Sequence, residues 1–502
     1  MRRLLVDVAI VGGGIAGSFL AKQLVRRGAS VAVIEKGGAT LAAQKPAGPA
    51  IGCAARRHDG VYNARNHVLG GNGYYWGGGL VRPQSTRLCD VLGLNRDGDD
   101  AASLEDIDRH FNAVEHDIGV RRPPRTADFP VSNPAVGSCC LSEIFVLPGR
   151  ARNVASVALK ELARTKGCAI LSDSDVIEFR TDSSRRVRGL RVACGGEPVV
   201  IDCNALVLCA GTVDTLLLLQ RHGAAFGLSE RDAIGAALHD HISLPIAGVS
   251  LTETSDFPNL VFPTFRAGGV VGKRFEIGGG AVGAARGVLH FQFLFDEVEP
   301  YREIKQILAL RQKGAGLQPI LMAAARSSSQ LPDLCRIGYE RYFKQRLYVG
   351  KTVPIVATLD FESAHSEDNR IELDREDGAR MTWDLRPADE RAFDHVIVRA
   401  NALLSELQTR YGLSLNPLGD FTTAAGRAAY LREKATDAYH LGGGVKYGDV
   451  IDHQLRLNRT DNVYVVSCAV FQRPGLANPT MTLLALAHRC ADAICGRAAA
   501  TK

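Results

Sequence analysis

The sequence lacks several features that mark common classes of protein. Its twelve cysteines include no CxxC pair and no spacing typical of a zinc site. No uninterrupted apolar run is long enough to cross a membrane, since the longest candidate, 205–219, contains Gly211 and Asp214. The 60 Lys and Arg residues only slightly outnumber the 54 Asp and Glu residues, and they form no basic stripe or tail. We therefore expect no structural zinc site, no membrane span and no nucleic-acid partner.

The sequence also has no GxSxG motif, no internal repeat and no low-complexity linker. Cys209, Cys468 and Cys490 lie in apolar stretches and are expected to be buried free thiols, which favours a reducing compartment. Arg2 and Arg3 precede an apolar stretch as in a signal peptide, but Asp7 interrupts that stretch. We therefore predict a cytoplasmic location.

Length and composition indicate a large α/β protein. The 502 residues exceed one ordinary core, so two domains or one elaborated domain are expected. A hydrophobic content of 46% with 23% charged residues is typical of globular proteins. The 52 glycines exceed the average share, and many fall in turns of the kind that doubly wound α/β folds require.

The N-terminal segment has the pattern of a dinucleotide clamp. An apolar run over 4–11 predicts a buried parallel strand that opens directly onto glycines. Gly12 permits the tight turn, Gly14 lets the backbone approach a pyrophosphate, and Gly17 lets the next helix pack closely. That helix, predicted over 18–27, points its positive N-terminal end at the phosphates.

A second strand, 30–34, ends in Glu35 at the distance expected for a carboxylate that binds the adenosine ribose. An acidic residue there argues against NADP, because it would repel the 2′-phosphate. The clamp by itself does not distinguish FAD from NAD.

The rest of the chain alternates between α/β and α+β patterns. Helices are predicted at 104–118, 150–166, 300–313, 388–411 and 479–495. Strands are predicted within 168–203, with a turn near 182–184, and at 205–212, 290–295, 356–361 and 462–466. The region 247–436 suits an antiparallel sheet that forms one wall of a pocket.

A glycine-rich loop at 69–83 interleaves Tyr74, Tyr75 and Trp76 with glycines. Such glycine density indicates backbone packed against something flat or charged. Because three aromatic side chains would not normally be left exposed, we expect this loop to be enclosed.

With these pieces placed, the chain resembles the glucose–methanol–choline (GMC) oxidoreductase family of flavoproteins. The resemblance rests on five segments spread from end to end: Gly12–Gly17 with Glu35; Gly70-Gly71; Leu208–Thr215; Ile234-Gly235 with Asp240-His241; and the C-terminal blocks 440–443, 450–452, 461–465 and 477–482. The last segment is the most specific, because both its order and its spacing fit.

The resemblance implies a discontinuous Rossmann-type FAD-binding domain and a smaller α+β substrate domain built on an antiparallel sheet. The FAD domain would comprise 1–246, including the flavin-contacting loop 69–83, and 437–502; the substrate domain would be 247–436. Some family members bind FAD covalently through a histidine, and the corresponding position here is Tyr75. We therefore expect non-covalent FAD.

The resemblance also implies site residues. His440 would accept the alcohol proton, a task that suits imidazole because its ordinary pKa lies near 6.5. Asn478 would hydrogen-bond the substrate oxygen, and Pro479 fits the first position of a helix whose positive end faces the flavin. The residues expected to contact the cofactor are Gly12, Gly14, Ile15, Ala16, Gly17, Glu35, Lys36, Gly70, Gly71, Asn72, Tyr75, Trp76, Gly77, Val176, Ala210, Gly211, Asp214, Ala469, Pro479 and Thr480.

Other histidines have simpler interpretations. His58 and His67 are expected in loops or at the surface. His239-Asp240-His241 lacks an apparent third and fourth ligand, so no metal is predicted. His290 and Gln292 share one face of a strand and either reach the substrate or form a solvated sheet face.

The leading hypothesis is an FAD-dependent alcohol oxidase or dehydrogenase acting on a small-molecule alcohol, with oxygen or another compound as electron acceptor. A His/Asn pair resembles members that act on ring secondary alcohols, and we favour a sugar, glycoside or sugar-like natural product over a sterol-like alcohol. The alternatives are a GMC-type lyase that uses FAD structurally and a non-catalytic flavin-binding protein. The sequence leaves the oligomeric state open.

Overall fold

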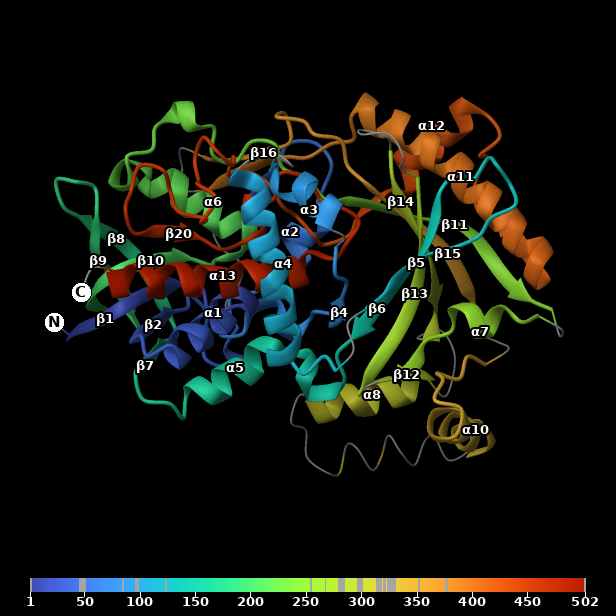
Figure 1. Cartoon of the computed structure of the whole chain (residues 1–502), viewed down its shortest axis with the longest axis horizontal. Coiled ribbons are helices and arrows are strands. Elements are labelled where there is room, and N and C mark those ends of the chain that lie inside the picture. Colours follow the sequence, from blue (N-terminus) through green and yellow to red (C-terminus); the bar gives the residue numbers. More distant parts are fainter. Residues whose placement is uncertain are drawn as a thin grey trace.

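The computed structural model describes residues 2–500, apart from 45–50, 84, 95–98, 122–123, 253–254, 267, 279–284, 296–300, 313–317, 319–321, 323–330, 351–352 and 375–377. Two large sheets dominate it, one toward each end of the long axis (Figure 1). The N- and C-termini lie together at the end that holds the first sheet (Figure 1).

The first sheet has a parallel centre, as predicted for a Rossmann-type domain. Its strands are β1 (Arg2–Val11), β2 (Val31–Ile34), β7 (Cys168–Leu171), β8 (Ser174–Thr181), β9 (Val187–Cys194), β10 (Glu197–Leu208) and β20 (Val463–Val465). They run in the order β7-β2-β1-β10-β9-β8, with β20 added beside β10. Strands β8 and β9 pair antiparallel with their neighbours, whereas the others pair parallel.

One strand differs from the prediction. The sequence suggested a separate strand at 205–212, but β10 runs unbroken from Glu197 to Leu208. Its first half pairs with β9, and β1 pairs with nearly its whole length. This continuous pairing with β1 keeps β10 a single strand. Helix α6 (Gly211–His222) then begins at Gly211, which has a φ of +72°.

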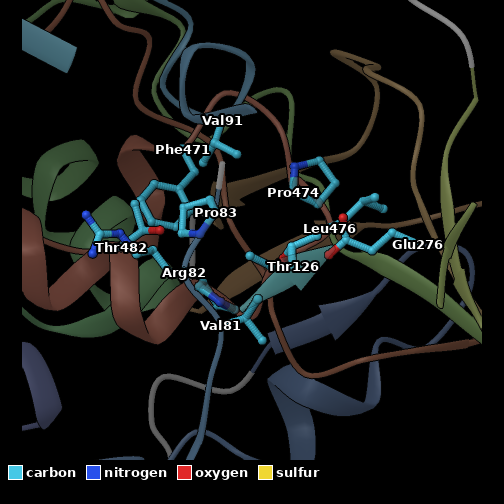
Figure 2. Close-up of a pocket in the computed structure, with 12 residues that line it drawn as sticks. Val81, Arg82, Pro83, Val91, Thr126, Glu276, Phe471, Pro474, Leu476 and Thr482 are labelled. Atoms are coloured by element: carbon cyan, nitrogen blue, oxygen red, sulfur yellow. The ribbon is translucent and has the colours of Figure 1, made fainter. Parts of the chain in front are cut away.

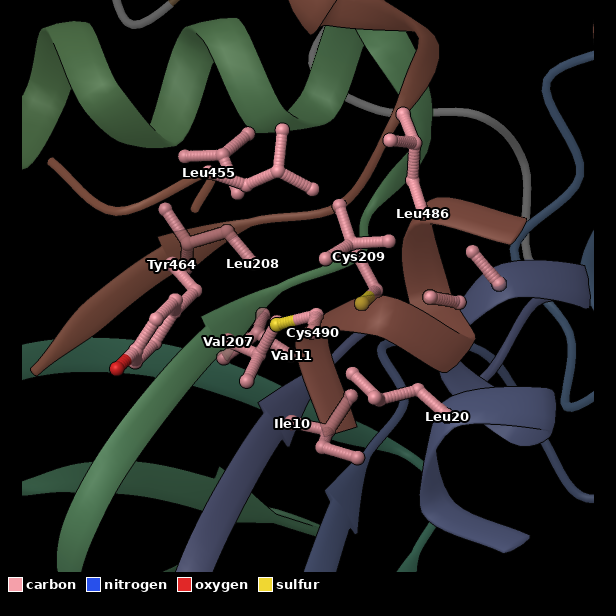
Figure 3. Packing of buried hydrophobic residues seen from close by; sticks show 14 of the residues in the cluster. Ile10, Val11, Leu20, Val207, Leu208, Cys209, Leu455, Tyr464, Leu486 and Cys490 are labelled. Atoms are coloured by element: carbon pink, nitrogen blue, oxygen red, sulfur yellow. The ribbon is translucent and has the colours of Figure 1, made fainter. Parts of the chain in front are cut away.

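The two ends of the chain share one hydrophobic core. Helix α1 (Ile15–Arg26) packs against α5 (Val154–Leu162) and α13 (Pro479–Ala500). Figure 3 shows Ile10 of β1 and Leu20 of α1 close to Cys490 of α13, all fully buried. Cys209 and Cys490 are buried free thiols, as expected, whereas Cys468 is only half-buried.

The second sheet is antiparallel, in the order β18-β11-β15-β14-β13-β6-β4. Its strands are β4 (Gly79–Leu80), β6 (Cys139–Val146), β11 (His241–Leu251), β13 (Gly269–Ile277), β14 (Gly287–Phe293), β15 (Ile355–Glu362) and β18 (Leu413–Pro417), with β5 (Thr126–Asp128), β12 (Thr264–Arg266) and β19 (Thr436–Asp437) along its sides. Strands β4, β5 and β6 come from before residue 247, so this sheet also uses chain that precedes 247–436.

The two faces of this sheet differ. One is apolar, with Phe275, Leu289 and Leu359 buried against α11 (Pro387–Tyr411). Because side chains alternate along a strand, the neighbouring residues Arg274, His290 and Asp360 point from the opposite face. The second sheet therefore presents a polar face made by β11, β13, β14 and β15.

The remaining elements connect or cover these sheets. A small third sheet consists of β3 (Ile51–Cys53), β16 (Arg370–Leu373) and β17 (Ala379–Thr382). The other helices are α2 (Asp59–Asn63), α3 (Ser85–Leu92), α4 (Asp99–Asp117), α7 (Phe257–Val261), α8 (Tyr301–Gln312), α10 (Leu331–Tyr342) and α12 (Ala424–Lys434). Of the predicted helix 300–313, residues 300 and 313 lie outside the described residues. Within the described ranges, no helix combines the length and apolarity needed to cross a bilayer.

Candidate active site

The turn between β1 and α1 has the geometry that a phosphate requires. Gly12 has a φ of +105°, and a Cβ there would lie 2.4 Å from the carbonyl oxygen of Cys209. A Cβ on Gly17 would lie 1.9 Å from the carbonyl oxygen of Gly12, so only glycine lets α1 start this close to the strand. Gly14, the N-cap of α1, has no side-chain cap, and no atom of the described residues lies within 4 Å of its missing Cβ. This open, uncapped helix end fits the pyrophosphate of FAD.

Glu35 lies buried at the end of β2. Its two carboxylate oxygens accept hydrogen bonds from the backbone N–H groups of Gly13 (2.9 Å) and Gly37 (2.8 Å). Burial raises the pKa of Glu35, and these two bonds partly oppose that shift. Since each oxygen has a further lone pair, the carboxylate can still accept from ribose hydroxyls, which remains a prediction. Lys36 points elsewhere and pairs with Asp175 at 3.1 Å.

Asp214, in the first turn of α6, is held by an arginine and a histidine that the sequence pattern did not connect with it. Its carboxylate accepts from Arg65 Nη2 (2.6 Å) and lies 3.1 Å from His67 Nε2. Burial alone would raise the pKa of Asp214, but these hydrogen bonds lower it to about 2. His67 lies in an irregular segment, as expected for a loop residue, but it is buried rather than at the surface. Asp214 therefore ties α6 to the segment before the glycine-rich loop.

The glycine-rich loop lies against the N-terminal turn. A Cβ on Gly71 would come within 3.1 Å of the Cα of Gly14. The expectation that all three aromatic residues are enclosed is wrong, because Tyr74 and Tyr75 are 38% and 57% exposed. The loop packs through its glycines in a short 3-10 turn, Gly71–Tyr74, which leaves these rings outside. The hydroxyl of Tyr75 donates to Gln44 Oε1 at 3.0 Å, and Trp76 packs against the core.

The other predicted cofactor residues lie at the ends of elements around this turn. Ala210 is the N-cap of α6 and Gly211 its first residue. Val176 lies in β8, whose first residue, Ser174, donates its N–H to the carbonyl oxygen of Glu35. Ala469 lies in the 3-10 turn Cys468–Val470, and Thr480 follows Pro479 at the start of α13. Their contacts with a bound cofactor remain predictions.

The two predicted catalytic residues come together. His440 Nε2 lies 3.4 Å from Asn478 Nδ2, although 38 residues separate them. Asn478 directly precedes α13, which begins at Pro479 as predicted. The backbone N–H of His440 donates to Asp240 Oδ2 at 2.8 Å, and this bond fixes the segment that carries the imidazole.

His440 is tuned to stay neutral. Burial lowers its pKa, and the adjacent imidazole of His241 lowers it further, to about 4, against the opposing effect of Asp240 and Asp360. A neutral imidazole is the form that can accept a proton.

Asp240 connects this site to His58, which was expected in a loop or at the surface. His58 is buried, with Nε2 3.2 Å from Asp240 Oδ2 and its ring edge-on to Trp383. Burial works to lower the pKa of His58, but the hydrogen bond and charge of Asp240 raise it overall. His58 therefore lies in a loop, as expected, but it is buried rather than at the surface. It lies at the N-cap of α2, and no local pattern in the sequence relates it to Asp240 in a distant part of the chain.

Asp240, His241 and His440 offer three atoms of metal-ligand type within 4.8 Å of one another. Each already has a protein partner, since both carboxylate oxygens accept backbone N–H groups and the two imidazoles contact each other. His239 turns to a different partner, with Nε2 2.9 Å from the carbonyl oxygen of Phe471. The prediction of no metal stays a prediction.

A cavity opens beside the start of α13 (Figure 2). Leu476, Ala477 and Pro479 line it next to Asn478, while Glu276 of β13 and Arg82 line it from other elements. Glu276 lies on the same face of β13 as Arg274, so the polar sheet face borders this cavity through Glu276.

Comparisons with known proteins agree with this geometry. Residues 7–263, half of the chain, match the family described as FAD dependent oxidoreductase, and residues 364–487 match the GMC oxidoreductase C-terminal family. The structure is similar to pyridoxine 4-oxidase from Mesorbium loti (15% identity, TM-score 0.58, covering 97% of this chain and 98% of that one). It is also similar to a variant of formate oxidase from Aspergillus oryzae RIB40 (13% identity, TM-score 0.59, covering 100% of both chains).

A curated relative, Neither inactivation nor afterpotential protein G of Drosophila melanogaster, is 39% identical over 62 residues. This match spans 12% of the chain and only 11% of the relative's length.

The two long matches to family models agree with the geometry of the phosphate turn and of the His440–Asn478 pair. The chain belongs to the FAD-dependent oxidoreductases, and within them to the GMC family.

Proposed function

We propose that this protein oxidises an alcohol group of a small molecule, with His440 as the proton acceptor and Asn478 as the residue that orients the reacting hydroxyl. The observation that carries this proposal is the 3.4 Å approach of Asn478 Nδ2 to His440 Nε2 at the N-terminus of α13. FAD, when bound, supplies the acceptor for the hydride that leaves the alcohol carbon. The hydroxyl proton is left for the protein to remove.

The pair suits this task. His440 Nε2 can accept the proton because the ring is neutral above about pH 4. The amide of Asn478 can hold the same oxygen and fix its direction, which reduces the entropic cost of reaching the reactive geometry. The positive end of the α13 dipole favours negative charge that develops beside the pair.

The polar sheet face supports a hydroxyl-rich substrate. Arg274 and Asp360 from this face are close enough to His440 to affect its pKa. His290 Nε2 lies 3.0 Å from Asp360 Oδ2, and Gln292 farther along β14 is exposed. Thr358 is buried, and its hydroxyl has no hydrogen-bond partner among the described residues.

A buried hydroxyl without a partner costs free energy unless a ligand satisfies it. We therefore favour a sugar, a glycoside or a sugar-like natural product over a sterol-like alcohol. The rings of a sterol carry few polar groups that could hydrogen-bond to the polar sheet face.

Anaerobic mixing of the FAD-loaded enzyme with sugars, polyols and sterols tests the proposal. An oxidisable alcohol should bleach the flavin absorbance, and admitting air then shows whether oxygen restores it. The His440→Ala variant should retain FAD and fail to bleach. Substrate cleavage with an unchanged flavin spectrum would instead indicate a lyase.

A further inference from the structure

His241 lies directly behind His440. Its Nδ1 is 3.0 Å from His440 Nδ1, and the two rings meet edge to face at 86°. Its other ring nitrogen, Nε2, is 2.5 Å from the carbonyl oxygen of Gly475, in the loop that leads to Asn478. The imidazole of His241 therefore links the proposed base to the loop that carries the base's partner.

The chain of hydrogen bonds has one direction. A carbonyl oxygen can only accept, so the hydrogen of neutral His241 is on Nε2 and its Nδ1 has a lone pair. That lone pair accepts from His440, which must then carry its own hydrogen on Nδ1. His440 Nε2, the nitrogen facing Asn478, is left unprotonated.

We infer that His241 is a positioning residue that selects the reactive tautomer of His440. This inference rests on the proposed function, because it matters for turnover only if His440 Nε2 accepts the alcohol proton. Without an acceptor behind it, His440 could carry its hydrogen on Nε2 and could not accept a second one there.

The placement of His241 is itself supported. Its backbone N–H donates to Asp240 Oδ1 at 2.6 Å, while Asp240 Oδ2 accepts the N–H of His440. One buried carboxylate thus holds the backbone of both histidines so that their imidazole rings are in contact. When the substrate O–H bond breaks, a new N–H bond forms at His440 Nε2, the Nδ1–H bond to His241 remains, and Asp240 and Asp360 offset the positive charge of the ring.

Three substitutions separate this role from simple packing. His241→Leu fills the space but offers no acceptor, and His241→Phe is a second such variant that keeps a ring. His241→Asn offers an amide oxygen at the position of Nδ1. Each FAD-loaded variant would be measured by rapid anaerobic flavin reduction with an oxidisable alcohol. Two-bond nitrogen–proton NMR of histidine-labelled protein would report which ring nitrogen of His440 carries the hydrogen.

We expect His241→Leu and His241→Phe to shift the hydrogen of His440 toward Nε2 and to slow flavin reduction by about 10-fold or more. His241→Asn should retain the Nδ1–H tautomer and most of the rate. The inference is overturned if His440 keeps its hydrogen on Nδ1 in the Leu and Phe variants, or if the rate survives the change of tautomer. If His440→Ala turns over normally, the proposed function fails, while the NMR result still decides whether His241 sets the tautomer.

Discussion

The backbone N–H of His440 and the side chain of Asp240 are joined by a 2.8 Å hydrogen bond across 200 residues of sequence. Asp240 also accepts the N–H of His241 and contacts His58, and it is fully buried. Three segments of the chain therefore depend on one carboxylate.

Replacing Asp240 with Ala should destabilise the protein. The change leaves the buried N–H of His241 and the part-buried N–H of His440 without this acceptor, at a cost of about 1–3 kcal/mol for a fully buried group. The free energy of unfolding from denaturant titration of the FAD-loaded protein measures this loss. Asp449→Ala, which removes an exposed partner of Lys446, is the control and should change stability by less than about 1 kcal/mol. Equal effects of the two substitutions would show that Asp240 does not organise the site.

His440→Ala should slow anaerobic flavin reduction by roughly 10²–10⁴-fold, because a positioned base contributes about that much to proton removal. FAD content, read from the absorbance of the purified protein, should stay at the wild-type level. His116→Ala serves as the control, since that side chain is almost completely exposed. A normal reduction rate in His440→Ala would contradict the assignment of the base.

Substitutions of Gly14 and Gly17 in the N-terminal turn should have different effects, the first on FAD binding and the second on stability. No described residue occupies the space beside Gly14, so Gly14→Glu should fold but lose FAD, because its carboxylate would repel the pyrophosphate. Gly17→Ala has no such space, since its Cβ would lie 1.9 Å from a carbonyl oxygen, and it should lower the free energy of unfolding even without FAD. Flavin content and denaturant titration of both apo variants separate the two effects. Retention of FAD by Gly14→Glu would disagree with the phosphate site.

Flavin reduction should stay constant from neutral pH down to about pH 5 and decline as the pH falls through about 4, where His440 becomes protonated. The sign follows from the role, since only the neutral ring accepts a proton. In the unfolded chain a histidine binds its proton near pH 6.5, so His440 should also make folding less favourable as the pH drops from 6.5 toward 4. The rate of anaerobic reduction against pH is the measurement, and an inflection near 6.5 would contradict the burial of this ring.

Thr358→Val should reduce kcat/KM for a hydroxyl-rich substrate by about 10-fold, since one hydrogen bond of about 1.4 kcal/mol would be lost. The same change should leave the unfolding free energy unchanged or higher, because the buried hydroxyl has no partner in the described structure. Thr215→Val removes another such hydroxyl and controls for the effect on stability. Unaltered kcat/KM for every accepted substrate would remove Thr358 from the pocket wall.

Local patterns predicted the Rossmann-type half of the fold well. An apolar strand followed by Gly12, Gly14 and Gly17 constrains the backbone over a few residues. The dinucleotide-binding turn could therefore be predicted from the local sequence. The boundary between 203 and 205 could not be predicted, because it depends on which neighbours pair with β10.

The parts of the site that were missed are those made by distant segments. His58, Arg65 and His67 stand in an irregular stretch with no periodicity, and their partners Asp240 and Asp214 lie well over 100 residues away. The exposure of Tyr75 was missed for a related reason, because the loop buries its glycines rather than its rings.

The shared core of the two termini has a consequence for biosynthesis. Strand β1 and helix α1 are synthesised well before β10 and α13, which cover them and follow roughly 200 and 450 residues later. The apolar flank of the nucleotide turn therefore stays uncovered until α13 has been made. Truncation before Pro479 should expose this flank, so the shortened protein should aggregate rather than merely lose activity.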